Sequence, residues 1–147
     1  MKYVVIGGIA ATLQGSTTIT RDFDICYSRD RTNLERLADA LRELSARLRG
    51  PDVDVPFQLD AAALRNGLNF TFKTKYGDFD CLGEPGGGFD YELLKRNSDQ
   101  MDVGGLAVMV ASLDDVIAMK RAAGRIKDRI EVENLSALRE VRDKKRA

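Results

Sequence analysis

Histidine is absent from this 147-residue chain, and cysteine occurs only twice, at Cys26 and Cys81. The lack of histidine excludes Ser-His catalytic triads, histidine zinc sites and histidine general bases. Two cysteines in a chain of this length are not typical of a disulfide scaffold, so we expect a cytoplasmic protein whose thiols are small buried hydrophobic groups. Any catalysis must therefore use carboxylates, lysines, arginines and bound metal.

The sequence also lacks net charge and long apolar runs. Lysine plus arginine number 23, as do aspartate plus glutamate, so no global positive field indicates nucleic-acid binding, although a local basic patch stays open. The apolar run 3–6 is far too short for a signal sequence or a membrane span, and we expect no membrane partner. With 44% hydrophobic and 31% charged residues, the chain has the composition of one globular domain.

Alternating strand and helix signals predict an α/β (α+β) fold in a single domain, with a mixed sheet flanked by helices. The predicted strands cover 3–6, 22–27, 68–73, 78–82, 100–103 and 106–110, the last two joined by a Gly104-Gly105 hairpin turn. The predicted helices cover 9–13, 34–48, 60–65, 91–96, 112–123 and 128–142. A capping box at 32–35 would begin the second helix and Gly50-Pro51 would end it, with a loop or weak strand at 52–58 and a frayed tail at 143–147.

The motif Asp22-Phe23-Asp24 places two carboxylates on one face of a predicted strand, about 7 Å apart along the backbone. Two such groups repel each other unless a cation neutralises them, and oxygen ligands suit Mg²⁺ or Mn²⁺. Upstream, Gly7-Gly8 ends the first strand, where backbone N–H groups can approach phosphate oxygens without interference from a Cβ atom. Together these features favour phosphoryl or nucleotidyl transfer over a solvated strand edge and a plain turn.

A third carboxylate is expected from the strand at 78–82. Asp78 and Asp80 share one face of it, and the residues alone leave open which of the two joins the site, or whether both lie on a solvated edge. A carboxylate there would complete a site for two metal ions and help to activate an attacking hydroxyl.

Five cations gather around Gly124, where one predicted helix ends and the next begins: Lys120, Arg121, Arg125, Lys127 and Arg129. This cluster is a candidate for contact with a triphosphate or a nucleic-acid backbone, the alternative being an ordinary charged surface. The glycine-rich loop at 84–88 lacks the Gly-Lys-Ser/Thr ending of a Walker A motif, so we interpret it as a mobile loop near the site.

The stretch YVVIGGIAATLQGSTTITRDFDI resembles the signature of minimal nucleotidyltransferases of the DNA polymerase beta-like superfamily. The later stretches YGDFDCLGEPGG and VASLDDVIAMKRAAGRIKD resemble its AbiEii/MenT-like toxin branch. The resemblance implies that Asp22, Asp24 and Asp80, rather than Asp78, hold two divalent ions (Mg²⁺ or Mn²⁺) and carry the catalysis. It also implies a nucleoside triphosphate such as ATP as substrate. The implied nucleotide-binding residues are Gly7, Gly8, Thr20, Arg21, Lys120, Arg125 and Lys127.

We therefore expect residues 1–147 to form a nucleotidyltransferase domain (EC 2.7.7 type) that lacks the helix preceding the first strand in many relatives. It would move a nucleoside monophosphate to an acceptor hydroxyl. In the toxin branch the acceptor is transfer RNA and the partner an antitoxin. The alternatives are an antitoxin-type or regulatory nucleotide-binding module without turnover, and a transferase that modifies a partner protein such as a HEPN-type toxin.

Overall fold

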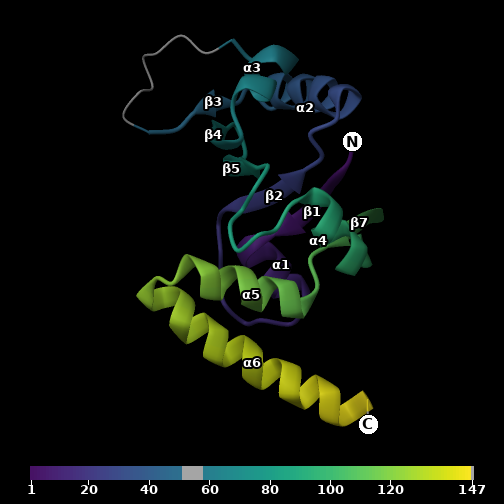
Figure 1. Cartoon of the computed structure of the whole chain (residues 1–147), viewed down its shortest axis with the longest axis vertical. Coiled ribbons are helices and arrows are strands. Elements are labelled where there is room, and N and C mark those ends of the chain that lie inside the picture. Colours follow the sequence, from purple (N-terminus) through teal and green to yellow (C-terminus); the bar gives the residue numbers. More distant parts are fainter. Residues whose placement is uncertain (51–57, 147) are drawn as a thin grey trace.

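The computed structural model describes residues 1–50 and 58–146. Within these ranges, strands and helices alternate as predicted and form one mixed α/β domain (Figure 1). The strands are β1 Tyr3–Ile6, β2 Phe23–Tyr27, β3 Arg47–Leu48, β4 Asn69–Thr74, β5 Gly77–Leu82, β6 Asp99–Val103 and β7 Leu106–Val110. The helices are α1 Gly7–Leu13, α2 Arg31–Glu43, α3 Ala61–Asn66, α4 Tyr91–Asn97, α5 Leu113–Ala123 and α6 Ile126–Arg146.

The strands form a single sheet in the order β3-β4-β5-β2-β1-β7-β6. β2 pairs with β5, and β1 with β7, in parallel, while the remaining neighbours are antiparallel. Because β1 and β2 pair antiparallel, with Ile6 opposite Asp24, the glycines that follow β1 and the acidic motif at the start of β2 meet at one place. No helix of the described chain is both long and apolar enough to cross a membrane.

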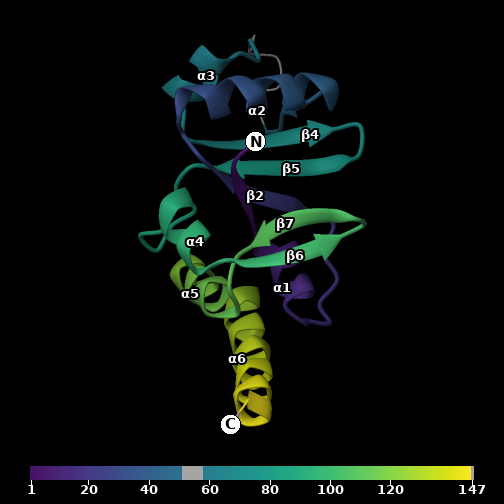
Figure 2. The ribbon, with the colours of Figure 1, turned by 90° about the vertical axis from the view of Figure 1, so that its right-hand side faces the viewer.

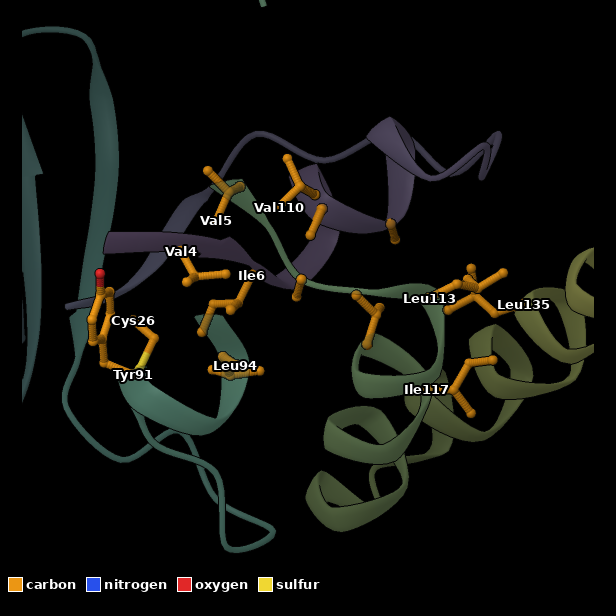
Figure 3. Close-up of a cluster of buried hydrophobic side chains, with 14 residues drawn as sticks. Val4, Val5, Ile6, Cys26, Tyr91, Leu94, Val110, Leu113, Ile117 and Leu135 are labelled. Carbon is orange, nitrogen blue, oxygen red and sulfur yellow. The ribbon is translucent and has the colours of Figure 1, made fainter. Parts of the chain in front are cut away.

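Two apolar clusters hold the sheet between its helices. In one, Leu37 and Leu41 of α2 and Leu64 of α3 are fully buried against β2, β4 and β5. In the other, shown in Figure 3, β1 and β7 pack with α4, α5 and Leu135 of α6. Figures 1 and 2 show α2 and α3 at one end of the molecule and α5 and α6 at the other.

The predicted local signals around α5 and the last hairpin are confirmed. The Ser112 hydroxyl accepts a hydrogen bond from the backbone N–H of Asp115 at 3.1 Å, and Gly124 ends α5 in the left-handed conformation (φ 67°). β6 and β7 pair around the Gly104-Gly105 turn.

The predicted boundaries of α2 are wrong at both ends. Asp30, and not the capping box at 32–35, caps the helix, since its carboxylate accepts a hydrogen bond from the backbone N–H of Asn33 at 2.7 Å. The helix ends at Glu43 because Ser45 turns into the left-handed region (φ 54°), and the chain then pairs with β4 as β3. The apolar spacing predicted a helix as far as residue 48 because Leu48 packs in the same apolar cluster from a strand.

Other boundaries differ by a few residues. α1 begins directly at Gly7, and β2 begins at Phe23, so Asp22 precedes the strand. The last helix begins at Ile126 and continues to Arg146, so the stretch expected as a frayed tail is its final turn, apart from residue 147, which lies outside the described residues. The loop or weak strand expected at 52–58 also lies outside them, except for Gln58.

Candidate active site

The turn from β1 into α1 forms one wall of the candidate site, and it requires glycine. Gly7 has a φ of 69°, and a Cβ atom there would lie 2.2 Å from Oδ2 of Asp24. A Cβ atom at Gly8 would lie 2.8 Å from the Thr20 hydroxyl oxygen. The two glycines therefore let the backbone approach both the acidic strand and the loop that leads into it.

Strand pairing brings two of the predicted carboxylates together. Asp24 of β2 is the direct register partner of Asp80 of β5, in a parallel pair. Phe23 and Phe79 are partners on the opposite face, where their rings meet edge to face at 5.3 Å between centroids. This alternation confirms that Asp24 and Asp80 share one face, and Asp22 lines the same cavity from the residue just before β2.

The electrostatics of this pair are unfavourable without a cation. Burial, and then the charges of Asp80 and Asp22, raise the pKa of Asp24 to about 7. Burial also raises the pKa of Asp80, an effect that the nearby Arg49 charge opposes. Oδ1 of Asp24 is buried and accepts no hydrogen bond, and Oδ1 of Asp80, also buried, has an Arg49 nitrogen 3.0 Å away. A buried carboxylate oxygen without a hydrogen bond is destabilising, and a divalent cation would satisfy it.

The donor set therefore fits a hard cation in its chemistry, although the ligands are not yet gathered. Asp22 is exposed, and across residues 1–50 and 58–146 no three acidic or thiol side chains are arranged to hold a metal ion as they stand. Asp24 and Asp80 form the fixed part of the set, because hydrogen-bonded strands carry both. Asp22 would have to move to join them.

The cavity at this acidic face has a volume of about 240 Å³, and α5, α6 and the 16–20 loop complete its walls. Of the predicted nucleotide-binding residues, six line it: Gly7, Gly8, Thr20, Lys120, Arg125 and Lys127. Arg21 does not line it. The loop is fixed to α1 by the Thr12 hydroxyl, which donates hydrogen bonds to the carbonyls of Gly8 (3.0 Å) and Thr18 (3.2 Å).

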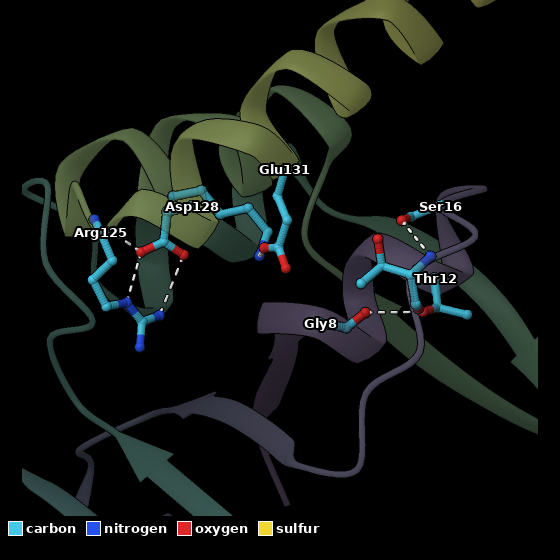
Figure 4. Close-up of polar contacts among 8 residues, drawn as sticks. Gly8, Thr12, Ser16, Arg125, Asp128 and Glu131 are labelled. Carbon is cyan, nitrogen blue, oxygen red and sulfur yellow. Dashed lines mark hydrogen bonds and ion pairs between the residues drawn. The ribbon is translucent and has the colours of Figure 1, made fainter.

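Two of the predicted cations already have acidic partners on α6. Lys120 forms an ion pair with Glu131, and Arg125 forms one with the buried Asp128 at 2.6 Å. Figure 4 shows Asp128 and Glu131 projecting from α6 toward the Gly8 end of α1. Lys127 is exposed and forms no ion pair within the described residues. A triphosphate in this cavity would thus compete with Asp128 and Glu131 for two of three cations.

Sequence reasoning missed Asp128, Glu131 and Arg49. Arg125 directly precedes α6 and Asp128 lies in its first turn, and this spacing of three residues was a usable signal for their ion pair. Arg49 lies 3.0 Å (Nη2) from Oδ1 of Asp80 and 3.4 Å (Nη1) from Oδ2 of Asp78. No local sequence pattern predicts that contact, because it depends on how β3 pairs with β4.

The two cysteines and the glycine-rich loop at 84–88 contribute little to the cavity. Cys26 and Cys81 are free and fully buried, which agrees with their interpretation as small hydrophobic groups, and burial raises the pKa of Cys26 to about 12. The glycine-rich loop borders the site through Pro85, which lines a neighbouring hollow together with Gly7 and Asp24.

Comparison with known proteins shows the class of fold. No protein-family model and no curated protein sequence matches this chain. Among solved structures, the fold is that of nucleotidyltransferases. The lincosamide antibiotic adenylyltransferase LnuA, solved with lincomycin bound, matches with a TM-score of 0.58 and 15% identity over 92% of this chain and 85% of its own. TM1012 of Thermotoga maritima, provisionally assigned as a nucleotidyltransferase, matches with a TM-score of 0.55 and 18% identity over 97% of this chain and 83% of its own.

Proposed function

We propose that this chain is a metal-dependent nucleotidyltransferase that moves a nucleoside monophosphate from a triphosphate to an acceptor hydroxyl. The observation that carries the proposal is the in-register pair of Asp24 and Asp80. Their carboxylates line a cavity that the Gly7-Gly8 turn also lines, and the buried Oδ1 of Asp24 accepts no hydrogen bond. The fold in common with an adenylyltransferase supports the same reaction class.

Each part of the cavity has a role in this reaction. Asp22, Asp24 and Asp80 would hold one or two Mg²⁺ or Mn²⁺ ions, which neutralise triphosphate charge and polarise the α-phosphorus. The backbone at Gly7 and Gly8 approaches the phosphates, since no side chain intervenes. Asp80 accepts the proton of the acceptor hydroxyl as the new P–O bond forms and the bond to pyrophosphate breaks.

The cations contribute by exchanging partners. Lys120 and Arg125 leave Glu131 and Asp128 to contact the triphosphate, and the unpaired Lys127 contacts it directly. This exchange limits how tightly a nucleotide binds without metal, because two ion pairs must first open. Thr20 and Arg21 belong to the loop over the site, where Thr20 faces Gly8.

The toxin-branch resemblance adds transfer RNA as the acceptor and an antitoxin as the partner. The test is incubation with Mg²⁺, each α-labelled nucleoside triphosphate in turn and total transfer RNA, with label followed on gels. We expect labelled RNA from the unaltered protein and from Asp143→Asn, which removes an exposed carboxylate of α6 far along the chain from the site. Asp24→Ala should give none.

The other outcomes separate the alternatives. Label on the protein or on a co-expressed neighbour, but not on RNA, would identify a protein acceptor. Mg²⁺-dependent nucleotide binding without any transfer would favour the regulatory module. Full transfer by Asp24→Ala would contradict the metal site itself.

A further inference from the structure

Arg49 lies beside the carboxylate pair, at the end of β3. Its backbone N–H donates to the Thr71 carbonyl at 2.9 Å, and its side-chain Nη1 donates to the Phe72 carbonyl at 3.2 Å, so both ends of the residue are fixed to β4. About a third of the side chain (33%) is exposed. The guanidinium group therefore lies against the sheet, between Asp78 and Asp80, instead of extending into solvent.

Arg49 is the cation that forms an ion pair with Asp80, one of the three candidate ligands. Within the described ranges, no other lysine or arginine forms an ion pair with Asp22, Asp24 or Asp80.

The contact between Arg49 and Asp80 is an ion pair beside the cavity. Nη2 lies 3.0 Å from Oδ1 of Asp80, and Asp80 also lines the cavity. Arg49 and a metal ion in the cavity would therefore compete for the same carboxylate.

We propose that Arg49 is a positioning residue that serves as the resident counter-ion of the carboxylate site, orienting Asp80 before metal binds and setting metal affinity by competing for it. This inference rests on the proposed function, because it requires that Asp80 bind a metal ion. Arg49 contacts neither nucleotide nor acceptor in this role.

The role predicts two changes of opposite sign when the charge is removed. The metal-free protein becomes less stable, because the largely buried Asp80 carboxylate loses its ion-pair partner. The metal ion binds more tightly, because the positive charge beside Asp80 is gone. If Arg49 were merely structural, removing its charge would lower both the metal-free stability and the affinity for the metal ion, since a loosened site would also bind metal more weakly.

The experiment compares Arg49→Gln with Arg47→Gln. Glutamine keeps a side-chain N–H for the Phe72 carbonyl and removes the charge. Arg47, two residues earlier in β3, is exposed and forms no ion pair in the described chain, so it loses the same charge without contact to the site. Mn²⁺ alone is titrated calorimetrically into each protein, and metal-free stability is measured by urea unfolding. Arg49→Lys retains the charge.

We expect Arg49→Gln to bind Mn²⁺ about tenfold more tightly and to unfold at lower urea, while Arg47→Gln and Arg49→Lys stay within about threefold of the unaltered affinity. If Arg49→Gln folds only with Mn²⁺, the proposal is supported, because the ion then replaces the guanidinium group. If it folds in neither condition, or binds Mn²⁺ more weakly, Arg49 is structural and the proposal is overturned. If the unaltered protein binds no Mn²⁺, the proposed function fails, and this inference fails with it.

Discussion

Substituting alanine at Gly7 tests whether the β1–α1 turn sets the position of the Asp24 carboxylate. The new Cβ atom would lie 2.2 Å from Oδ2 of Asp24, so the carboxylate must rotate away. The backbone at φ 69° is also unfavourable for alanine, at a cost of about 1–2 kcal/mol. Gly104→Ala is the matched control, because Gly104 has a φ of 62° and open space where its Cβ atom would lie.

The comparison separates the backbone cost from the effect on the site. The backbone cost should lower the Tm of both variants by about 2–8 °C, since 1 kcal/mol corresponds to roughly 2–4 °C for a chain of this size. Mn²⁺ with ATP at about 100 times its Kd should stabilise the unaltered protein by about 2.7 kcal/mol. A tenfold weaker Kd in Gly7→Ala would remove about 1.4 kcal/mol of that gain, or roughly 4 °C.

Thermal unfolding with and without Mn²⁺ and ATP measures both quantities in one set of samples. We expect Gly104→Ala to keep the full ligand-induced shift and Gly7→Ala to lose at least half of it. Equal shifts in the two variants would refute the reasoning, because the displaced Asp24 carboxylate would then have no part in binding.

Three further predictions concern the core, the α6 ion pair and the metal. Leu37→Ala, at a fully buried position of α2, should lower the free energy of unfolding, measured in urea, by about 2–5 kcal/mol. Arg36→Ala, on the exposed face of the same helix, should change it by less than about 0.5 kcal/mol. Equal losses would contradict the packing described. The Arg125 charge and hydrogen bonds hold the pKa of Asp128 below its usual range, so this carboxyl group stabilises the protein above about pH 4 and that contribution is lost as the pH falls further. The stability difference between the unaltered protein and Asp128→Asn should therefore shrink in acid, and a constant difference would show that the charge is irrelevant. EDTA should abolish transfer and added Mg²⁺ restore it, while transfer that persists in EDTA would require another mechanism.

Much of the fold could be predicted because its signals are local. The alternation in 78–82 placed Phe79 and Asp80 on opposite faces, and the Gly104-Gly105 turn defined the last hairpin. The failure at α2 has a physical cause: leucines continue at helical spacing past Glu43, but burial of Leu48 is achieved from a strand. Apolar spacing reports which residues are buried and not which element buries them.

The candidate site likewise contains residues that local sequence predicts and residues that only the packing of distant segments brings in. Asp22, Asp24 and Asp80 could be found because short strands carry their motifs, and their meeting follows from the pairing of β2 with β5. Arg49 could not be found, because it reaches Asp80 across 31 positions of sequence through the pairing of β3 with β4. The ion pairs of Lys120 and Arg125 required the packing of α6 against α5.

The in-register pairing of Asp24 with Asp80 also means that the residues that space the carboxylates differ from the residues that would recognise ligands. The spacing of the two backbone positions that carry these carboxylates is set by the separation of adjacent strands, about 4.8 Å. The residues that would recognise nucleotide and acceptor lie elsewhere, on α5, α6 and the loop before β2. Under the proposed function, substitutions in those elements would change what is recognised while the strand spacing beneath the carboxylates stays constant.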